Sequence, residues 1–319
     1  MSERSFLIDS PTGAALQTYR TEPERPARAV LLVLHGLAEH AGRHRSLALE
    51  LARGGLAVYV HDHRGHGSTT AIDAPLRRFA GKGGPAKLTR DVHAVRQRAE
   101  AEHPGCPVFV LGHSMGAHLA LNYAQTYGEG LAGLLLWNAS FERGWQMRLG
   151  RAALKAEKAL KGSDVASAVF ARATFEIWSK SMTTRRTAFD WLSHDEQVVD
   201  RYIADPLCGW TPTISMVEDL FALIDDAMLP GRLAKISRRL PIHCLGGSDD
   251  PATAGGTEVR RLAVRLQEAG SLDVTCHIVE GARHETLNER DPQRDEALRE
   301  LMGFIDHHAA VAPKPFGAL

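Results

Sequence analysis

The chain has 319 residues, of which 44% are hydrophobic, so it can bury the core of one large domain or of a domain with an insertion. The chain has 38 lysine and arginine residues and 38 aspartate and glutamate residues. This balanced net charge does not indicate a nucleic-acid partner or a strongly acidic substrate. Four widely spaced cysteines without a C-x-x-C motif indicate reduced thiols in a cytoplasmic protein. The sequence shows no signal peptide and no transmembrane helix, so we expect neither.

Strand and helix patterns alternate through the first part of the chain. Weak alternation over residues 5–20, with a turn at 11–13, predicts an antiparallel hairpin. Apolar runs typical of strands covered on both faces follow at 29–34, 56–60, 108–111 and 131–137. Helical patterns separate them at 42–53, 88–101 and 117–124. This order predicts an α/β fold with a mostly parallel, doubly wound sheet and right-handed crossovers.

The pattern changes after residue 139. No strong strand pattern occurs at 140–236, where helices are predicted at 148–161, 165–179 and 215–226. Strands return at 240–247 and 274–279, with helices at 257–269 and 292–307. We therefore predict a core made of residues 1–139 and 237–310, a helical cap inserted at 140–236, and a flexible tail at 311–319.

Ser114 lies between Gly112 and Gly116, directly after a predicted strand and before a predicted helix. Strand, sharp turn and helix around a G-x-S-x-G sequence predict a nucleophile elbow, which lifts the serine hydroxyl to the tip of the turn. The glycines are needed because side chains at their positions would strike the adjoining strand and helix. The amide of Met115, at the start of the helix, is a candidate donor to a developing oxyanion.

The acid and the base follow two later strands. A serine hydroxyl needs a base that is oriented by a third group. His284 follows the strand at 274–279, and Asp249 and Asp250 follow the strand at 240–247. Asp250 is favoured because Pro251 holds its backbone extended, and Asp249 remains the alternative. The second oxyanion donor is expected just after the first long strand, where Gly36 lets the chain turn and the amide of Leu37 is the candidate.

Several of these segments together resemble a known family. The chain is similar to the monoacylglycerol lipase and lysophospholipase group of α/β-hydrolases over nearly its whole length, at residues 35–43, 61–67, 112–116, 186–193, 250–251 and 283–289. The resemblance implies the α/β-hydrolase fold with an inserted cap. It also implies Ser114 as nucleophile, Asp250 as acid, His284 as base, and the Leu37 and Met115 amides as the oxyanion hole.

We expect a serine hydrolase that cleaves carboxylic esters through an acyl-enzyme and needs neither a metal nor an organic cofactor. The expected partner is a small-molecule acyl ester, with a monoacylglycerol or lysophospholipid as the first candidate. Gly36, Trp137 and Trp191 are candidates to line its pocket, and Trp137 departs from the family pattern in a way that would narrow it. A thioesterase, an amidase, a cofactor-free peroxidase and, in a different class, a ligand-binding receptor on the same fold remain alternatives.

Three other motifs have competing interpretations. His61, His63 and His66 suggest a metal cluster, but Gly65 stands where such clusters place an aspartate, so a turn that shapes the rim of the active site is preferred. The Gly-rich segment 81–84 lacks the spacing of a phosphate loop. The basic, amphipathic helix at 148–158 is either a solvated face of the cap or a peripheral contact with a membrane surface.

Overall fold

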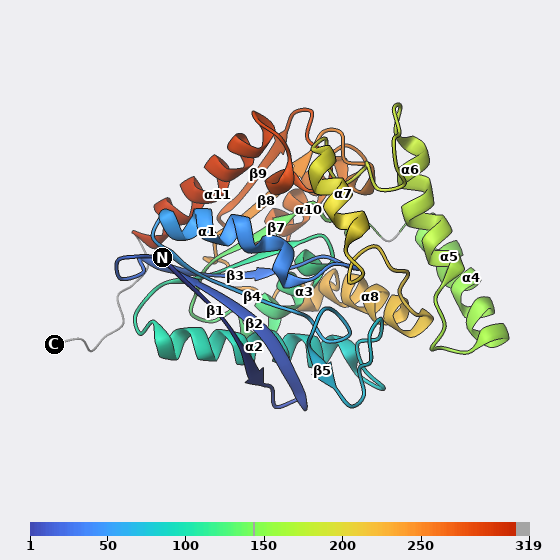
Figure 1. The fold of residues 1–319 in the computed structure, drawn as a ribbon, viewed down its shortest axis with the longest axis horizontal. Coiled ribbons are helices and arrows are strands. Elements are labelled where there is room, and N and C mark those ends of the chain that lie inside the picture. Colours follow the sequence, from blue (N-terminus) through green and yellow to red (C-terminus); the bar gives the residue numbers. More distant parts are fainter. Residues whose placement is uncertain (143, 311–319) are drawn as a thin grey trace.

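A single mixed sheet runs through the computed structural model, which describes residues 1–142 and 144–310 (Figure 1). The strand order is β1-β2-β4-β3-β6-β7-β8-β9, with β5 paired to β2. The β1–β2, β2–β4 and β2–β5 pairs are antiparallel, and all the others are parallel. The strands are β1 (Ser2–Asp9), β2 (Ala14–Glu22), β3 (Ala29–Leu34), β4 (Leu56–His61), β5 (Thr70–Ala71), β6 (Val108–His113), β7 (Leu131–Trp137), β8 (Ile242–Gly247) and β9 (Val274–Val279).

Helices cover both faces of this sheet (Figure 1). Successive strand residues point to opposite faces, so the continuous apolar strands contribute to two separate cores. Leu31 and Val33 of β3 belong to the core under α1 (Arg45–Arg53) and α11 (Gln293–Ala309). Leu32 and Leu34 belong to the core on the other face, which is covered by α2 (Gly84–Glu102), α3 (Met115–Tyr127) and α10 (Thr257–Glu268).

The chain between β7 and β8 is helical. Its elements are α4 (Trp145–Lys161), α5 (Ala168–Ala171), the π-helical turn η2 (Arg172–Glu176), α6 (Ile177–Ser181), α7 (Glu196–Ala204), α8 (Ile214–Ala227) and α9 (Pro230–Leu233). Helix α8 packs against α3, whereas α4, α5 and α6 lie farther out, beyond the ends of the strands (Figure 1). This helical segment therefore lies over the ends of the strands that carry the predicted site.

Two features of the helical segment differ from the sequence prediction. The helix predicted at 165–179 begins only at Ala168, because Ala166 forms a β-bridge with Thr213 and the Ser167 side chain caps the amide of Phe170. Helix α7 is not predicted; it is short, and its start is marked by the Asp195 side chain, which accepts from the amides of Gln197 and Val198.

The predicted doubly wound α/β sheet is confirmed, as is the opening hairpin. The tail predicted at 311–319 lies outside the described residues. Among the helices that the structure describes, none is both long enough and apolar enough to cross a membrane.

Candidate active site

Ser114 occupies a strained turn between β6 and α3. Its backbone has φ 55° and ψ −119°, a conformation that non-glycine residues rarely adopt. A Cβ on Gly112 would lie 2.2 Å from the carbonyl oxygen of Gly116, and a Cβ on Gly116 would lie 2.0 Å from that of Leu34. Both positions therefore require glycine, because the turn is pressed between β3 and the start of α3.

The structure brings Ser114, His284 and Asp250 together. The Ser114 hydroxyl lies 3.0 Å from His284 Nε2, to which it can donate a hydrogen bond. On the other side of the ring, His284 Nδ1 lies 3.0 Å from each carboxylate oxygen of Asp250. Each residue follows the carboxyl end of a different strand, namely β6, β9 and β8. The hydroxyl, the imidazole and the carboxylate thus form a continuous hydrogen-bonded chain.

Asp250 is fully buried, and its neighbours fix its orientation. Its oxygens accept from the Ala252 amide at 2.9 Å, the Thr253 hydroxyl at 2.9 Å and the Asn138 side-chain amide at 3.3 Å. Burial alone would raise the pKa of Asp250, but the charge of His284 and these hydrogen bonds outweigh it and lower the pKa. The carboxylate is thereby held ionised beside the imidazole.

Asp249 is the alternative acid considered from the sequence, and it faces away. Its side chain is 50% exposed, and one of its oxygens accepts from the Ser248 hydroxyl. Its closest ring is that of His194, at 4.0 Å, not His284. The structure therefore brings Asp250, rather than Asp249, to His284.

The two candidate oxyanion donors, the amides of Leu37 and Met115, belong to residues of the same cavity as Ser114. Within the described part of the chain, neither amide donates a hydrogen bond to another group. Ala38, next to Leu37, has φ 58°, and its carbonyl accepts from Tyr202 Oη at 3.0 Å and from the Gly209 amide at 2.9 Å. The helical segment between β7 and β8 thus holds the loop that carries the Leu37 amide.

A buried charge cluster lies behind these groups. Glu39 accepts from the Gly36 amide at 2.6 Å and from Arg43 at 2.8 Å, and Arg43 also binds Glu285. Burial opposes the charged forms, but Arg43 keeps the pKa of Glu39 and that of Glu285 below the usual range. Sequence analysis assigned no role to these residues. One sequence feature could have indicated them: charged residues occur in segments 35–43 and 283–289, which directly follow or lie near the ends of apolar strands. Charged residues at such buried places are expected to be paired.

His113, which precedes Ser114, joins this cluster to His284. Its Nε2–H donates to the His284 carbonyl at 2.9 Å, and its Nδ1 lies 3.7 Å from Glu39. Burial would lower the pKa of His113, but Glu39, Glu285 and the His284 carbonyl together raise it. His113 therefore connects the backbone of His284 to the Glu39 carboxylate, which accepts from the Gly36 amide.

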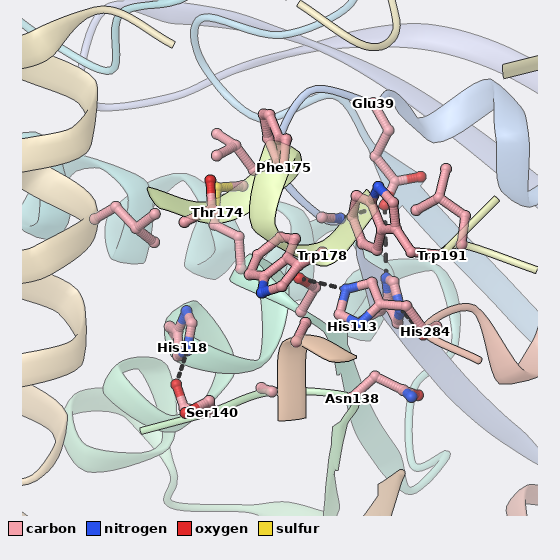
Figure 2. A pocket seen from close by; sticks show the side chains of 18 of the residues that line it. Glu39, His113, His118, Asn138, Ser140, Thr174, Phe175, Trp178, Trp191 and His284 are labelled. Atoms are coloured by element: carbon pink, nitrogen blue, oxygen red, sulfur yellow. Dashed lines mark hydrogen bonds and ion pairs between the residues drawn. The ribbon is translucent and has the colours of Figure 1, made fainter. Parts of the chain in front are cut away.

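Ser114 lines a cavity of about 210 Å³. Figure 2 shows this cavity with His284 and other lining residues labelled. One end is polar, because four of the lining residues gather around Arg43 or Glu39, namely Glu39, His113, Tyr202 and Glu285. The other end is mostly apolar and is lined by Met147, Phe170, Phe175, Trp178, Leu220, Phe221 and Ile224. Trp178 and Trp191 lie beside His284, with ring centroids 6.3 and 5.1 Å from that of its imidazole. Gly36 and Trp191 both line this cavity, and their contact with a substrate stays a prediction.

Trp137 is not part of this cavity, contrary to its prediction as a pocket residue. It is the last residue of β7 and points to the face covered by α1 and α11, where it is 1% exposed. The physical reason is the two-residue period of a strand: Leu136 faces α3 and Trp137 faces the opposite core. Because both faces of β7 are apolar, the sequence offered no alternation from which to choose.

His61, His63 and His66 are buried rather than placed at the rim. Burial lowers the pKa of His61 to about 3 and that of His63 and His66 well below the usual value. His66 Nε2 accepts from the Ala38 amide at 3.4 Å, so this turn supports the Leu37 loop from behind. Among the described residues, the side chains that could together hold a metal ion are those of His40, Asp205 and Cys208. Both ring nitrogens of His40 already have a partner there: Nε2 bonds the Asp205 carboxylate, and Nδ1 accepts from the Gly42 amide.

Comparison with known proteins decides the family. A family model described as "Serine aminopeptidase, S33" within the hydrolases matches residues 25–291, which is most of the chain. The chain belongs to this family. Human monoglyceride lipase is 35% identical over 91% of this chain and 86% of its own length. The monoacylglycerol lipase of Mycolicibacterium smegmatis is 27% identical over 90% of this chain and 91% of its own length.

Solved structures of esterases and lipases share the fold of this chain. A thermostable carboxyl esterase from Bacillus coagulans, in complex with glycerol, superposes with a TM-score of 0.86 and 26% identity over 97% of this chain and 99% of that chain. A monoglyceride lipase from Saccharomyces cerevisiae, at 18% identity and a TM-score of 0.72, shows the shared fold. The chain is therefore a monoglyceride lipase-like α/β-hydrolase, an ester-hydrolysing serine hydrolase of the lipase and esterase type that acts on a small-molecule ester.

Proposed function

We propose that this hydrolase cleaves monoacylglycerols through an acyl-enzyme on Ser114. The observation that carries the proposal is the 3.0 Å contact between the Ser114 hydroxyl and His284 Nε2, at the point where the polar and apolar ends of one cavity meet. An ester bound there has its acyl chain in the apolar end and its alcohol in the polar end. The scissile carbonyl then lies beside the nucleophile.

The proposed mechanism uses only side chains and amides of this chain. His284 takes the proton of Ser114 as the hydroxyl attacks the ester carbonyl, and Asp250 stabilises the imidazolium that forms. The Leu37 and Met115 amides donate hydrogen bonds to the oxyanion, and each lowers the free energy of the transition state by about 3 kcal/mol. His284 returns the proton to the departing alcohol. A water molecule then attacks the acyl-enzyme with His284 again as the base.

The polar end of the cavity supports an uncharged alcohol. Glu39 and Glu285 line this end with carboxylates whose pKa values are lowered, and Tyr202 adds a phenol. Arg43 offsets one of these two negative charges, so this end keeps a net negative charge. The carboxylates accept hydrogen bonds from the hydroxyls of glycerol, whereas the phosphate of a lysophospholipid would meet like charge. This argument favours a monoacylglycerol over a lysophospholipid, the other first candidate.

The test compares two substrates with the same acyl chain. Purified protein is given 1-monooleoylglycerol or oleoyl lysophosphatidylglycerol, whose headgroup carries a phosphate and no cation. Each is dispersed in the same detergent, and kcat/KM is measured by release of oleate. We expect monooleoylglycerol to be preferred by about tenfold or more, and Ser114→Ala to release oleate from neither. Equal rates, or faster release from the phospholipid, would contradict the headgroup assignment.

We also propose that the helical segment at 140–236 is a cap whose outer face contacts a lipid surface. Trp145, Leu149 and Leu160 lie on one face of α4 and are 68%, 60% and 84% exposed, beside the basic side chains of the same helix. Flotation with vesicles that contain phosphatidylserine tests this. We expect wild type to float and the double variant Trp145→Ser, Leu149→Ser to stay behind with unchanged hydrolysis of a short, water-soluble ester. Equal flotation of both would contradict it.

The four cysteines support a cytoplasmic location. Cys106, Cys208, Cys244 and Cys276 are all free thiols, and burial raises the pKa of each. Free, protonated thiols persist in a reducing compartment.

A further inference from the structure

Three polar side chains interrupt the apolar end of the cavity. His118, Ser140 and Thr174 line it together with Met147, Phe170 and Trp178 (Figure 2). An acyl pocket built only for methylene groups gains nothing from polar side chains, because an aliphatic chain removes water from them and offers no hydrogen bond in return. Their presence therefore needs a reason in the chemistry of the acyl group.

One ring nitrogen of His118 is a hydrogen-bond acceptor to which no described group donates. It lies four residues after Ser114 on α3, which places it about one helical turn from the nucleophile. Its Nε2–H donates to the Ser140 carbonyl at 2.8 Å, so Nδ1 carries the lone pair. Nδ1 is buried and has no partner among the described residues. Burial also lowers the pKa of His118 to about 4, so the ring is neutral near pH 7 and keeps this acceptor.

A bound hydroxyl group can both donate and accept a hydrogen bond, and Ser140 and Thr174 offer a further donor and a further acceptor. The Ser140 hydroxyl accepts from the Glu142 amide at 3.3 Å, and the structure shows no acceptor for its own hydrogen within the described residues. The Thr174 hydroxyl donates to the Phe170 carbonyl at 2.7 Å, which leaves its lone pairs available. Thr174 lies on the π-helical turn η2, an irregularity that often accompanies functional sites.

We propose that His118, with Ser140 and Thr174, makes this hydrolase selective for acyl groups that carry a hydroxyl a few carbons from the ester carbonyl. The inference rests on the proposed function and specifies its acyl substrate. The substrate hydroxyl donates to His118 Nδ1 or Thr174 Oγ1 and accepts from the Ser140 hydroxyl. Met147, an unbranched side chain at the same end, gives the pocket room to adjust as the hydroxyl reaches the buried nitrogen.

The selectivity follows from the unpaired acceptor. A site that is built to bond a hydroxyl disfavours the analogue without it, because the buried polar groups of the protein are then left unpaired. One such hydrogen bond corresponds to about a tenfold difference in kcat/KM between two chains of equal length. The distance of about one helical turn between Ser114 and His118 places the favoured hydroxyl beyond the second carbon of the chain.

The experiment uses 4-nitrophenyl esters of one chain length, either unsubstituted or with a single hydroxyl at the third or the sixth carbon. Wild type is compared with His118→Leu and with Thr174→Val, which keeps the shape of the threonine. His93→Leu is the matched control, because His93 lies on α2 outside the cavity and bonds Tyr123.

We expect wild type and His93→Leu to prefer one hydroxylated ester by about tenfold in kcat/KM. His118→Leu should lose this preference, so that its kcat/KM values for the hydroxylated and the unsubstituted esters become equal, and Thr174→Val should reduce the preference. Equal kcat/KM for all esters with wild type would overturn this inference alone, as would an unchanged preference in both His118→Leu and Thr174→Val. A wild type that hydrolyses none of the esters would overturn the proposed function and this inference with it.

Discussion

Arg43 and Glu285 form a two-point ion pair in which Nη1 lies 2.6 Å from Oε1 and Nη2 lies 2.8 Å from Oε2. This pair joins the loop that carries the Leu37 amide to the loop that carries His284. Both side chains are almost completely buried, and Arg43 also binds Glu39, whose carboxylate holds the Gly36 amide. One guanidinium therefore links the loop of the proposed oxyanion donor, Leu37, to the loop of the proposed base, His284.

Replacement of Arg43 should damage both stability and turnover. Arg43→Met leaves Glu39 and Glu285 as uncompensated buried carboxylates, which destabilises the fold by about 3–5 kcal/mol and lowers kcat by about a hundredfold as the two loops separate. Arg43→Lys keeps the charge but loses the two-point geometry, so it should fall between. Urea unfolding and kcat measure these effects.

Arg45→Met is the control for the Arg43 variants, because Arg45 forms an exposed pair with Glu3. It should change the free energy of unfolding by less than about 1 kcal/mol. If Arg43→Met were as mild as Arg45→Met, Arg43 would not hold the two loops together.

The two neighbouring aspartates should respond differently to the same change. Asp250→Asn removes the carboxylate that orients His284 and should lower kcat by about 10⁴-fold. Asp249→Asn changes an exposed side chain and should leave kcat within about twofold of wild type. Steady-state hydrolysis of a short ester by the two variants measures this, and a larger loss for Asp249→Asn would reverse the assignment of the acid.

Glycine to alanine changes should have opposite signs at two positions. A Cβ on Gly116 would overlap the Leu34 carbonyl oxygen, so Gly116→Ala should destabilise the protein by about 3 kcal/mol or more and displace Ser114. Gly150 lies in α4 with open space around it, so Gly150→Ala should stabilise by about 0.5–1 kcal/mol. Melting temperatures distinguish the two; equal shifts would refute the tight turn at Gly116.

Stability should fall as the pH drops from about 6.5 to about 4, because unfolded histidine has a pKa near 6.5. Burial lowers the pKa of His35, His118 and His243 to about 4 and that of His61 to about 3. In that range the unfolded chain binds protons that the native state does not. Each such histidine therefore removes about 1.4 kcal/mol of stability per pH unit.

Melting temperature measured across this range tests the histidine contribution. His243→Leu, which lies away from the cavity, should make the decline shallower by the share of one histidine. A melting temperature that stays constant from pH 7 to pH 5 would show that these rings are not buried in their neutral form.

Much of the fold was predictable because its signals are local. Continuous apolar strands, the glycines around Ser114 and the order of serine, aspartate and histidine each follow from the chemistry of a few adjacent residues. Pro251 likewise indicated Asp250 through a local backbone preference, and the structure places that residue beside His284.

What the sequence could not supply depends on tertiary contacts. The Arg43–Glu285 pair joins residues far apart in the chain, and neither motif reveals its partner. The side to which Trp137 points was undetermined because both faces of β7 are buried. His118 looked like an ordinary helix residue, since its importance comes from the cavity that α8 and the η2 turn close around it.

Labelling with a fluorophosphonate probe tests the central claim most directly, because the probe bonds only to a serine whose hydroxyl is activated by a base. Intact mass and peptide mapping should show one probe on Ser114 of the folded wild type, strongly reduced labelling of Asp250→Asn, and none on Ser114→Ala. A folded wild type that stays unlabelled, or a Ser114→Ala variant that labels as well as wild type, would contradict the account.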